Sequence, residues 1–283
     1  MSSRQASGHA VPGKASFAEA YEQPDPRGYF RALGPYEYVT PHHAQRVFRL
    51  LTAAREPRTV VDLCCSYGIN AALLNHRVSL AELYHRYTDH ALDDLSTPEL
   101  SLRDRQFYAA RRRSEAVPVV GIDVASGPVE YARRAGLLSA AFAENLERTT
   151  PSAALRAAVA DAGLVTVTGG VGYVSARSFD HLLACVESPP WVASFVLRAV
   201  PYGPIAEVLA EYGLVTERLA RTFRQRRFTG VEERAGALQA VLDAGLDPTG
   251  LESAGWFHAE LYVSRPTAQV RARPLATLLA ADT

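Results

Sequence analysis

The sequence predicts a doubly wound α/β domain with a mostly parallel sheet, and three observations lead to this prediction. Apolar runs of strand length alternate along the chain with stretches of helical periodicity, as parallel sheets require. The first strand starts near Thr59, runs into Asp62 and leads into small residues that end at Gly68. The second strand ends in Asp123. In doubly wound nucleotide-binding folds, an acidic residue at this place accepts hydrogen bonds from the two hydroxyls of a ribose.

Length and charge fit one large domain without a polyanionic partner. The chain has 283 residues, of which 48% are hydrophobic, and this is enough to bury a single core. Lysine plus arginine and aspartate plus glutamate number 30 each. Because no net field attracts nucleic acid or an anionic membrane, we expect neither as a partner. Two arginine clusters, 111–113 and 224–227, either hold a phosphate or carboxylate or lie on a solvated face.

Three cysteines argue against a disulfide framework, because their number is odd and two of them are adjacent. They are Cys64, Cys65 and Cys185. No C-x-x-C pattern or matching histidine pair accompanies them, so we expect no metal site. The adjacent pair either packs as small residues beneath the loop or includes a nucleophile. The cysteine content predicts a cytoplasmic protein.

The N-terminal part is expected to consist of a tail, an arm and a helix. Residues 1–16 lack the apolar run of a signal peptide and predict a disordered tail, with the folded domain over 17–283. Residues 25–38 combine turn residues with aromatics. This arm either covers the mouth of the binding site or packs on the outer core, and the tyrosines concerned are Tyr29, Tyr36 and Tyr38. Pro41 and the apolar spacing after it predict a helix directly before the first strand.

The step from the first strand to the second is longer than a minimal one. Asp62 and Asp123 are 61 positions apart (123 − 62), whereas a minimal step brings the second acid after about 20 residues. We therefore expect a helical insertion over 77–115, which forms a lid over the site or the contact of a homodimer. Its polar side chains include either surface groups or a catalytic base; these are His76, His85, Asp89 and His90.

The rest of the chain continues the alternation. We expect helices over 128–138, 153–162, 178–185, 205–211 and 231–244, and extended segments over 140–143, 164–168, 191–197, 214–227 and 256–264. Glycines occupy positions 169, 170 and 172, directly after the fourth strand. Three glycines in four residues indicate close approach of the backbone to a ligand or a strained turn.

Four successive blocks resemble class I S-adenosylmethionine-dependent methyltransferases of the small-molecule type. Residues 60–68 (VVDLCCSYG) stand where that family has V-L-D-L-G-C-G-x-G, and residues 121–125 (GIDVA) stand where it has G-I-D-x-S. Residues 143–146 correspond to the segment that flanks the adenine, and 164–174 to the fourth strand and its loop. One departure is that Cys64 and Ser66 replace the first two loop glycines, and neither takes positive φ as freely as glycine.

The resemblance implies a seven-stranded, Rossmann-like methyltransferase sheet closed by an antiparallel pair of strands. It also implies S-adenosyl-L-methionine as cofactor and methyl transfer to a small-molecule acceptor, with specialised metabolism as the expected setting. Asp123 would hydrogen-bond the ribose. The cofactor-binding residues that it implies are Asp62, Cys64, Ser66, Gly68, Asp123, Val124, Glu144, Asn145, Thr168 and Gly169.

Methyl transfer is an in-line displacement that depends on positioning and on exclusion of water. A base is useful where the acceptor is a hydroxyl or a carbon acid, and the candidates are Tyr173, His258 and Glu260. His258 is alternatively a histidine with its hydrogen bonds satisfied or one on the surface.

Two other functions remain open. A nicotinamide-dependent oxidoreductase needs a G-x-G-x-x-G pattern, which follows neither strand; a non-catalytic S-adenosylmethionine-binding protein would keep the fold alone.

Overall fold

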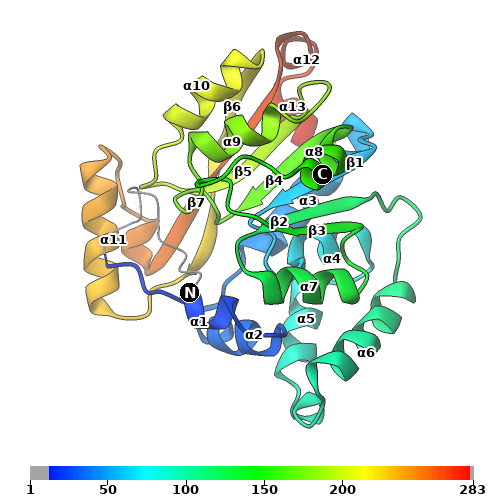
Figure 1. Ribbon diagram of the computed structural model, residues 1–283. Coiled ribbons are helices and arrows are strands. Elements are labelled where there is room, and N and C mark those ends of the chain that lie inside the picture. The colour runs from blue at the N-terminus through cyan, green and yellow to red at the C-terminus, as the bar shows by residue number, and fades with distance from the viewer. Residues whose placement is uncertain (1–12, 281–283) are drawn as a thin grey trace.

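The computed structural model describes residues 13–280, which form a seven-stranded sheet with helices on both faces (Figure 1). The strand order is β3-β2-β1-β4-β5-β7-β6. Strands β1 to β5 pair in parallel, whereas β7 is antiparallel to both β5 and β6. The predicted doubly wound, mostly parallel sheet is confirmed, and so is the antiparallel closure. The strands are β1 (Thr59–Leu63), β2 (Val119–Asp123), β3 (Ala140–Ala143), β4 (Ala162–Thr168), β5 (Trp191–Leu197), β6 (Leu214–Arg227) and β7 (Trp256–Pro266).

Helices precede, connect and follow these strands. The first half has α1 (Ala18–Tyr21), α2 (Arg27–Leu33), α3 (Thr40–Arg55), α4 (Ile69–Asn75), α5 (Leu80–Thr88), α6 (Thr97–Ala109) and α7 (Ser126–Arg134). The second half has α8 (Ala153–Val159), α9 (Ala176–Leu183), α10 (Gly203–Glu211), α11 (Val231–Asp243), α12 (Thr267–Ala272) and α13 (Leu275–Ala280). No helix within the described range has both the length and the apolar composition needed to cross a bilayer.

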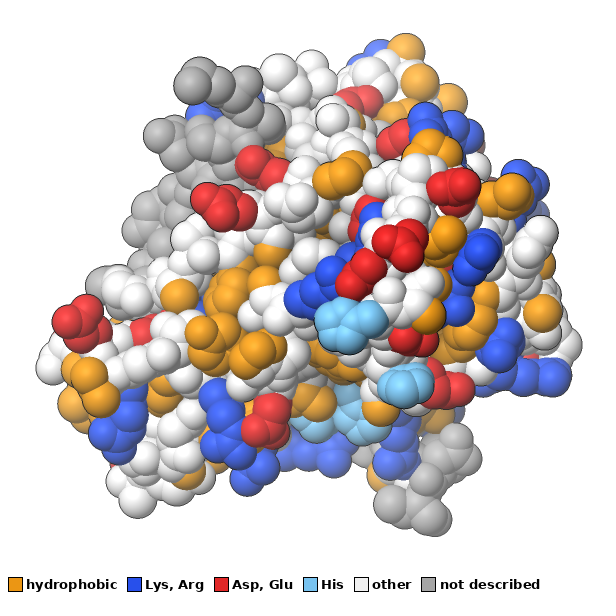
Figure 2. Space-filling model, turned by 90° about the horizontal axis from the view of Figure 1, so that it is seen from below, with side chains coloured by type: hydrophobic (Ala, Val, Ile, Leu, Met, Phe, Trp, Pro, Cys, Tyr) orange, Lys and Arg blue, Asp and Glu red, His pale blue; other side chains and the backbone are white. Residues whose placement is uncertain are grey.

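The surface mixes charges of both signs. Figure 2 shows acidic and basic side chains interspersed over the face seen from below, with histidine side chains among them. This distribution agrees with the equal numbers of acidic and basic residues in the sequence. On this face, no broad field of one sign is available to hold a charged polymer.

Successive residues of the central strands enter two different cores, one on each face of the sheet. In β1, Val60 belongs to the cluster that contains Phe48 of α3 and Leu73 of α4, whereas Val61 belongs to the cluster that contains Phe179 of α9. Both residues are at most 1% exposed. Burial on both faces explains why these strands read as continuous apolar runs.

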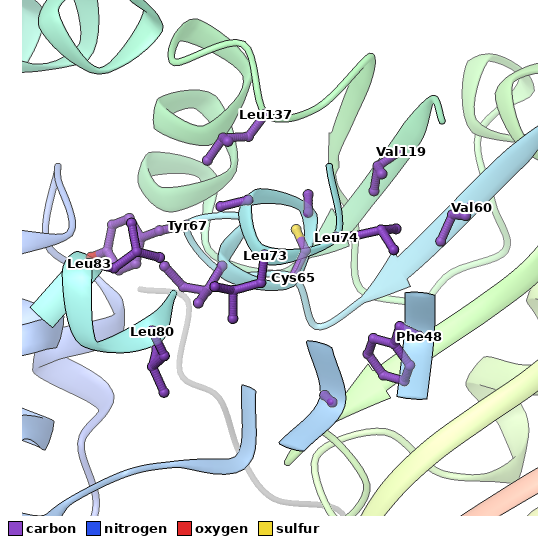
Figure 3. Packing of buried hydrophobic residues seen from close by; sticks show 14 of the residues in the cluster. Phe48, Val60, Cys65, Tyr67, Leu73, Leu74, Leu80, Leu83, Val119 and Leu137 are labelled. Carbon is purple, nitrogen blue, oxygen red and sulfur yellow. The ribbon is translucent and has the colours of Figure 1, made fainter. Parts of the chain in front are cut away.

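Cys65 is part of the first core. Figure 3 shows its side chain beside Leu73 and Leu74, and the residue is 3% exposed. A Cβ atom at Gly121 would lie 2.8 Å from the Cys65 Sγ and 2.5 Å from a methyl group of Leu138. Glycine at position 121 is therefore required by packing, because these two side chains fill the space that a larger residue would need.

The helical insertion is fixed to the domain through Asp104, which is fully buried. Its carboxylate accepts hydrogen bonds from Arg86 at 2.6 and 2.9 Å and from the hydroxyls of Tyr87 and Tyr131. Tyr131 lies on α7, so this network joins α5, α6 and α7. None of the residues 77–115 contributes to the main pocket described below. The expectation that they form its lid therefore has no support in this structure, and a dimer contact stays a prediction.

The N-terminal part differs from the expectation. Residues 1–12 of the expected tail lie outside the described residues. Ordered contacts begin before Phe17, because the Ala15 N–H donates a hydrogen bond to Glu233 Oε1 at 2.7 Å. The expected arm contains α2 and a 3₁₀ turn at Gly34–Tyr36, and Tyr29 is buried in the core of the domain.

Most other expected elements are present. The helix expected over 153–162 ends at Val159 because β4 already begins at Ala162. The short helices α12 and α13 were not predicted. Leu275, Leu278 and Leu279 of α13 are buried, so this helix extends the first core.

Candidate functional site

The main pocket lies at the carboxyl ends of β1, β2 and β4, where the strand order changes direction. In open α/β sheets, ligands bind in the crevice at such a switch point. The walls come from the loops after β1, β2, β3 and β4, from the N-terminal segment Lys14–Ala18, and from the end of β6. Figure 1 shows the start of the described chain close to α11, far from it in sequence.

The loop after β1 has the backbone of a glycine loop without the glycines. Cys64 and Ser66 have φ angles of 63° and 50°, and Gly68 has 72°. The left-handed conformation costs a residue with a Cβ atom roughly 1–2 kcal/mol. The chain bears this cost at the two positions where the family resemblance has glycine, so the loop keeps its path while its residue types differ.

Asp123 is held at the pocket wall by the backbone. It is 4% exposed and lines the pocket. Its Oδ2 accepts a hydrogen bond from the Ser66 N–H at 3.0 Å, and its Oδ1 accepts one from the Ala125 N–H at 3.1 Å. Each carboxylate oxygen has further lone pairs. The fixed carboxylate can therefore accept hydrogen bonds from the two hydroxyls of a ribose.

The two polar residues after β3 differ in what they can offer a ligand. Glu144 and Asn145 both line the pocket. The carboxylate of Glu144 already accepts from the Ser152 hydroxyl at 2.6 Å and from the Ser152 N–H at 2.9 Å. In the side-chain amide of Asn145, the oxygen accepts from the Glu147 N–H at 3.0 Å, whereas the nitrogen has no partner among residues 13–280. The amide nitrogen of Asn145 is thus the better candidate to meet the edge of a base.

A buried polar cluster lies behind the loop. Asp62 Oδ1 accepts from Asn70 Nδ2 and from the Thr166 hydroxyl, both at 3.0 Å. Asn70 Nδ2 also donates to the hydroxyl of Thr168, a pocket residue, at 2.9 Å. Asp62 Oδ2 and Asn70 Oδ1 have no partner among the described residues. Burial raises the pKa of Asp62 to about 7.

These two unpaired oxygens are acceptors in a buried place, and a donor-only group such as an ammonium would satisfy both. The cluster is therefore compatible with the amino group of the methionine part of S-adenosylmethionine. Neither Asp62 nor Asn70 lines the pocket itself, and the cluster reaches the pocket through Thr168.

Seven of the expected cofactor-binding residues line the pocket, and three do not. The seven are Cys64, Asp123, Val124, Glu144, Asn145, Thr168 and Gly169. Asp62 and Ser66 lie behind the wall and act through Asn70 and Asp123. Gly68 precedes α4, and a Cβ atom there would lie 3.1 Å from the Cβ of Ala132. Its role is to let α4 pack against α7.

Of the expected catalytic residues, the pocket contains Tyr173 but not His258. The His258 ring nitrogen Nδ1 lies 3.2 Å from the Thr222 hydroxyl on β6, and burial lowers the pKa of His258 to about 4. Glu260 accepts from Arg218 at 2.7 Å and from Tyr262 at 2.6 Å. His258 does not line the pocket, and its side chain contacts β6, so its catalytic role stays a prediction without support in this structure.

Of two polar residues opposite the β4 loop, sequence reasoning named Tyr38, as part of the arm that covers the mouth of the site, and missed Gln225. Tyr38 and Gln225 line the pocket, and a Cβ atom at Gly169 would lie 3.3 Å from Tyr38 Oη and 3.7 Å from Gln225 Nε2. The Val39 N–H donates to the Gln225 backbone oxygen at 2.7 Å, which joins the N-terminal arm to β6. The register of β6 shifts between Arg224 and Arg227. No pattern in the sequence indicates this shift, which places both Gln225 and Arg226 inside.

The arginine cluster at 224–227 has separate internal partners. Arg226 donates to both carboxylate oxygens of Glu233, at 2.9 and 2.6 Å. Arg224 and Arg227 lie over the ring of Trp256, at 4.9 and 4.5 Å from its centroid. The alternative that this cluster holds a ligand phosphate is therefore weakened for Arg226, whose buried charge is already paired.

Comparisons with known proteins add distant similarities in structure only. No family model matches the sequence, and no curated protein matches it. A solved structure of magnesium protoporphyrin IX methyltransferase from Synechocystis with bound S-adenosylmethionine is 12% identical, covers 79% of this chain and 80% of its own, and has a TM-score of 0.38. Geranyl diphosphate C-methyltransferase from Streptomyces coelicolor, solved with S-adenosylhomocysteine, is 12% identical. The match covers 80% of this chain and 79% of that one, with a TM-score of 0.40. YcgJ from Bacillus is 9% identical; the match covers 80% of this chain and 99% of that one, with a TM-score of 0.45.

The first two of these neighbours are methyltransferases by name. At such identities and scores, the function proposed below rests on the geometry of the pocket.

Proposed function

We propose that this chain is an enzyme that transfers a methyl group from S-adenosylmethionine to a small-molecule acceptor. The observation that carries the proposal is the crevice between β1 and β4, where a left-handed loop follows β1 and the fixed carboxylate of Asp123 ends β2. The antiparallel β7 between β5 and β6 supports it, because the resemblance implies such a closure, whereas the dinucleotide-binding order is 3-2-1-4-5-6.

The residues present fit the parts of S-adenosylmethionine. Asp123 accepts from the ribose hydroxyls, and Asn145 donates to the adenine edge beside the apolar side chains of Val124 and Leu146. Asp62 and Asn70 lie behind the pocket wall and support the methionine side of the site through Thr168, whose hydroxyl accepts from Asn70 Nδ2 at 2.9 Å. When bound, the cofactor supplies a methyl group activated by its positively charged sulfur.

The protein's part in the reaction is to position the acceptor and to exclude water. Positioning alone can contribute about 7–11 kcal/mol to lowering a barrier of this type. Lys14, Phe17 and Tyr38 form a cover over the β4 loop. Burial raises the pKa of Tyr38 well above its usual value, so its phenol stays protonated and serves as a hydrogen-bond donor. Tyr173 is the remaining candidate base within the pocket.

A small acceptor fits this enclosure better than a polymer does. Aromatic side chains from the N-terminal segment cover the pocket, and the charges on the face in Figure 2 alternate in sign. Nucleic-acid binding would need distributed positive charge. We place the enzyme in specialised metabolism, with a cytoplasmic location, as part of the same proposal.

Binding measurements test the cofactor assignment. Asp123→Ala should weaken S-adenosylmethionine binding by about 1.5–3 kcal/mol, because a charge-assisted hydrogen bond is lost. Asp94→Ala, at an exposed position of the insertion, is the matched control and should bind as the parent does. Isothermal titration with S-adenosylmethionine, S-adenosylhomocysteine and NAD measures all three proteins. An unchanged dissociation constant in folded Asp123→Ala, or binding of NAD alone, would overturn the assignment.

Turnover is tested separately. The protein is incubated with methyl-labelled S-adenosylmethionine and small-metabolite extract, in parallel with total RNA and with a protein lysate. Label in the small-molecule fraction is expected. Label only in RNA or protein contradicts the acceptor class, and tight binding with no label in any fraction favours the non-catalytic alternative.

A further inference from the structure

The main pocket has two halves that face different strands. Asp123, Val124 and Asn145 lie at the ends of β2 and β3, on one side of the β1 loop. Tyr38, Gln225 and the N-terminal segment lie over β4 and the end of β6, on the other side. The first half contains the residues assigned to the nucleoside. The second half is left for the acceptor and is called the acceptor half here.

Gln225 presents an unsatisfied acceptor in this half. The residue is 3% exposed, and its Oε1 has no hydrogen-bond partner among the described residues. A buried polar atom without a partner is unfavourable, and a ligand with a donor recovers this cost on binding. The side-chain amide that carries this oxygen lies beside the β4 loop, because a Cβ atom at Gly169 would lie 3.7 Å from Gln225 Nε2 and 3.3 Å from Tyr38 Oη.

Lys14 presents a cation in the same half that has no ion pair within the described part of the chain. It is the only lysine of the sequence, and its ammonium lies 5.9 Å from the centroid of the Tyr173 ring. Burial, with a further contribution from the charge of Arg226, lowers the pKa of Lys14 to about 8. The nearby carboxylate of Glu233 is already used by Arg226, by Thr229 and by the Ala15 N–H. An anionic group on a ligand could therefore pair with the Lys14 ammonium, which has no ion pair of its own among the described residues.

We propose that the acceptor is a small organic anion with a hydroxyl or N–H group, and that Gln225 recognises this donor while Lys14 binds the carboxylate or other acidic group. This inference rests on the proposed methyl transfer and extends it to the substrate class. Gln225 and Lys14 are specificity-determining residues in this proposal. Phe17, Tyr38 and Tyr173 supply an aromatic wall between them, which suits a flat acceptor.

Three probe compounds separate the two contacts. 4-Hydroxybenzoate has both groups, 4-methoxybenzoate lacks the hydroxyl donor, and 4-hydroxybenzamide lacks the charge. Their binding is measured by isothermal titration or competition in the presence of saturating S-adenosylhomocysteine. The parent protein should prefer 4-hydroxybenzoate over each of the others by about tenfold, since each contact is of the strength of one hydrogen bond or ion pair.

The variants assign each preference to one residue. Gln225→Leu should abolish the preference for hydroxyl over methoxy, Gln225→Glu should retain it, and Lys14→Met should abolish the preference for the acid over the amide. The matched controls are the exposed residues Gln239→Leu and Arg58→Met, and both should behave as the parent. Preferences that survive in Gln225→Leu and Lys14→Met, or an absence of binding of all three probes, overturn this proposal. Failure of S-adenosylhomocysteine itself to bind refutes the methyl-transfer proposal instead, so the two failures are distinguishable.

Discussion

The buried carboxyl group of Asp62 lowers the stability of the fold at neutral pH, and Asp62→Asn should remove this cost. Its pKa is about 7 in the folded chain and about 4 in the unfolded chain. A pKa difference of about 3 between the two states corresponds to a loss of about 4 kcal/mol in the free energy of unfolding. Below pH 4 the group is protonated in both states and costs nothing. As the pH rises from 4 to 7, only the unfolded chain ionises, so the folded state loses stability.

Asparagine is isosteric and cannot ionise. Its side-chain oxygen can still accept from Asn70 and Thr166, and its amide can face the unpaired Asn70 Oδ1. Asp62→Asn should therefore be more stable than the parent by about 1 kcal/mol at pH 5 and by up to about 4 kcal/mol at pH 8. The same change should weaken S-adenosylmethionine binding, because Asp62 holds Asn70, which donates to the pocket residue Thr168.

Urea unfolding at pH 5 and pH 8 measures the difference between the two proteins, so other titrating groups cancel. Asp94→Asn is the control, since it is exposed and should show no pH-dependent difference. The reasoning is refuted if Asp62→Asn is destabilised at pH 8, or if its gain in stability is the same at both pH values. An unchanged affinity for S-adenosylmethionine would refute only the role of Asp62 in binding.

Three further predictions concern the loop and the insertion. Cys64→Gly and Ser66→Gly should each stabilise the protein by up to about 1 kcal/mol in urea unfolding, because relief of the left-handed strain exceeds the added chain entropy. A nucleophilic Cys64 would instead be revealed by an inactive Cys64→Ser variant together with a covalent adduct on the parent protein, seen by intact mass. Gly170→Ala should be strongly destabilising, since its Cβ would lie 2.8 Å from the Cys64 Sγ, and Cys64→Gly should partly rescue it in a double-mutant cycle; additive effects would contradict this contact. Asp104→Ala should cost about 3–5 kcal/mol, because Arg86 is left without its buried partner, while the cofactor dissociation constant of the folded variant stays unchanged; a large loss of affinity would show that the insertion serves the site.

The sequence predicted the sheet well because its signals are local. Val119–Asp123, Ala140–Ala143, Trp191–Leu197 and Leu214–Arg227 occupy the expected bounds. The first three are apolar runs, which are the same in any tertiary setting, whereas Leu214–Arg227 mixes five arginines with its apolar and β-branched residues. Asp123 and the β1 loop followed from position alone, since residues directly after parallel strands meet at one edge of the sheet.

The acceptor half could not be predicted because it depends on contacts between distant parts of the chain. The inward direction of Gln225 follows from an irregular register in β6, and strict alternation would have given a different face. Lys14 belonged to a segment whose composition indicates disorder, and its place is fixed by α11. His258 shows the opposite case. Its place on the last strand was predicted, but a place on a strand does not tell that the side chain contacts Thr222 of β6.

The hydrogen bond between Ala15 and Glu233 has a consequence for the order of assembly. The two residues are 218 positions apart, so the N-terminal cover of the pocket cannot close before most of the chain has been synthesised. Loop closure over such a length carries a high entropic cost, and contacts of this kind form after the local ones. The parallel strands can therefore be in place while the pocket is still open along one side. During synthesis, the nascent chain would form the half of the pocket that is assigned to the nucleoside first. The acceptor half would form only with the last third of the protein.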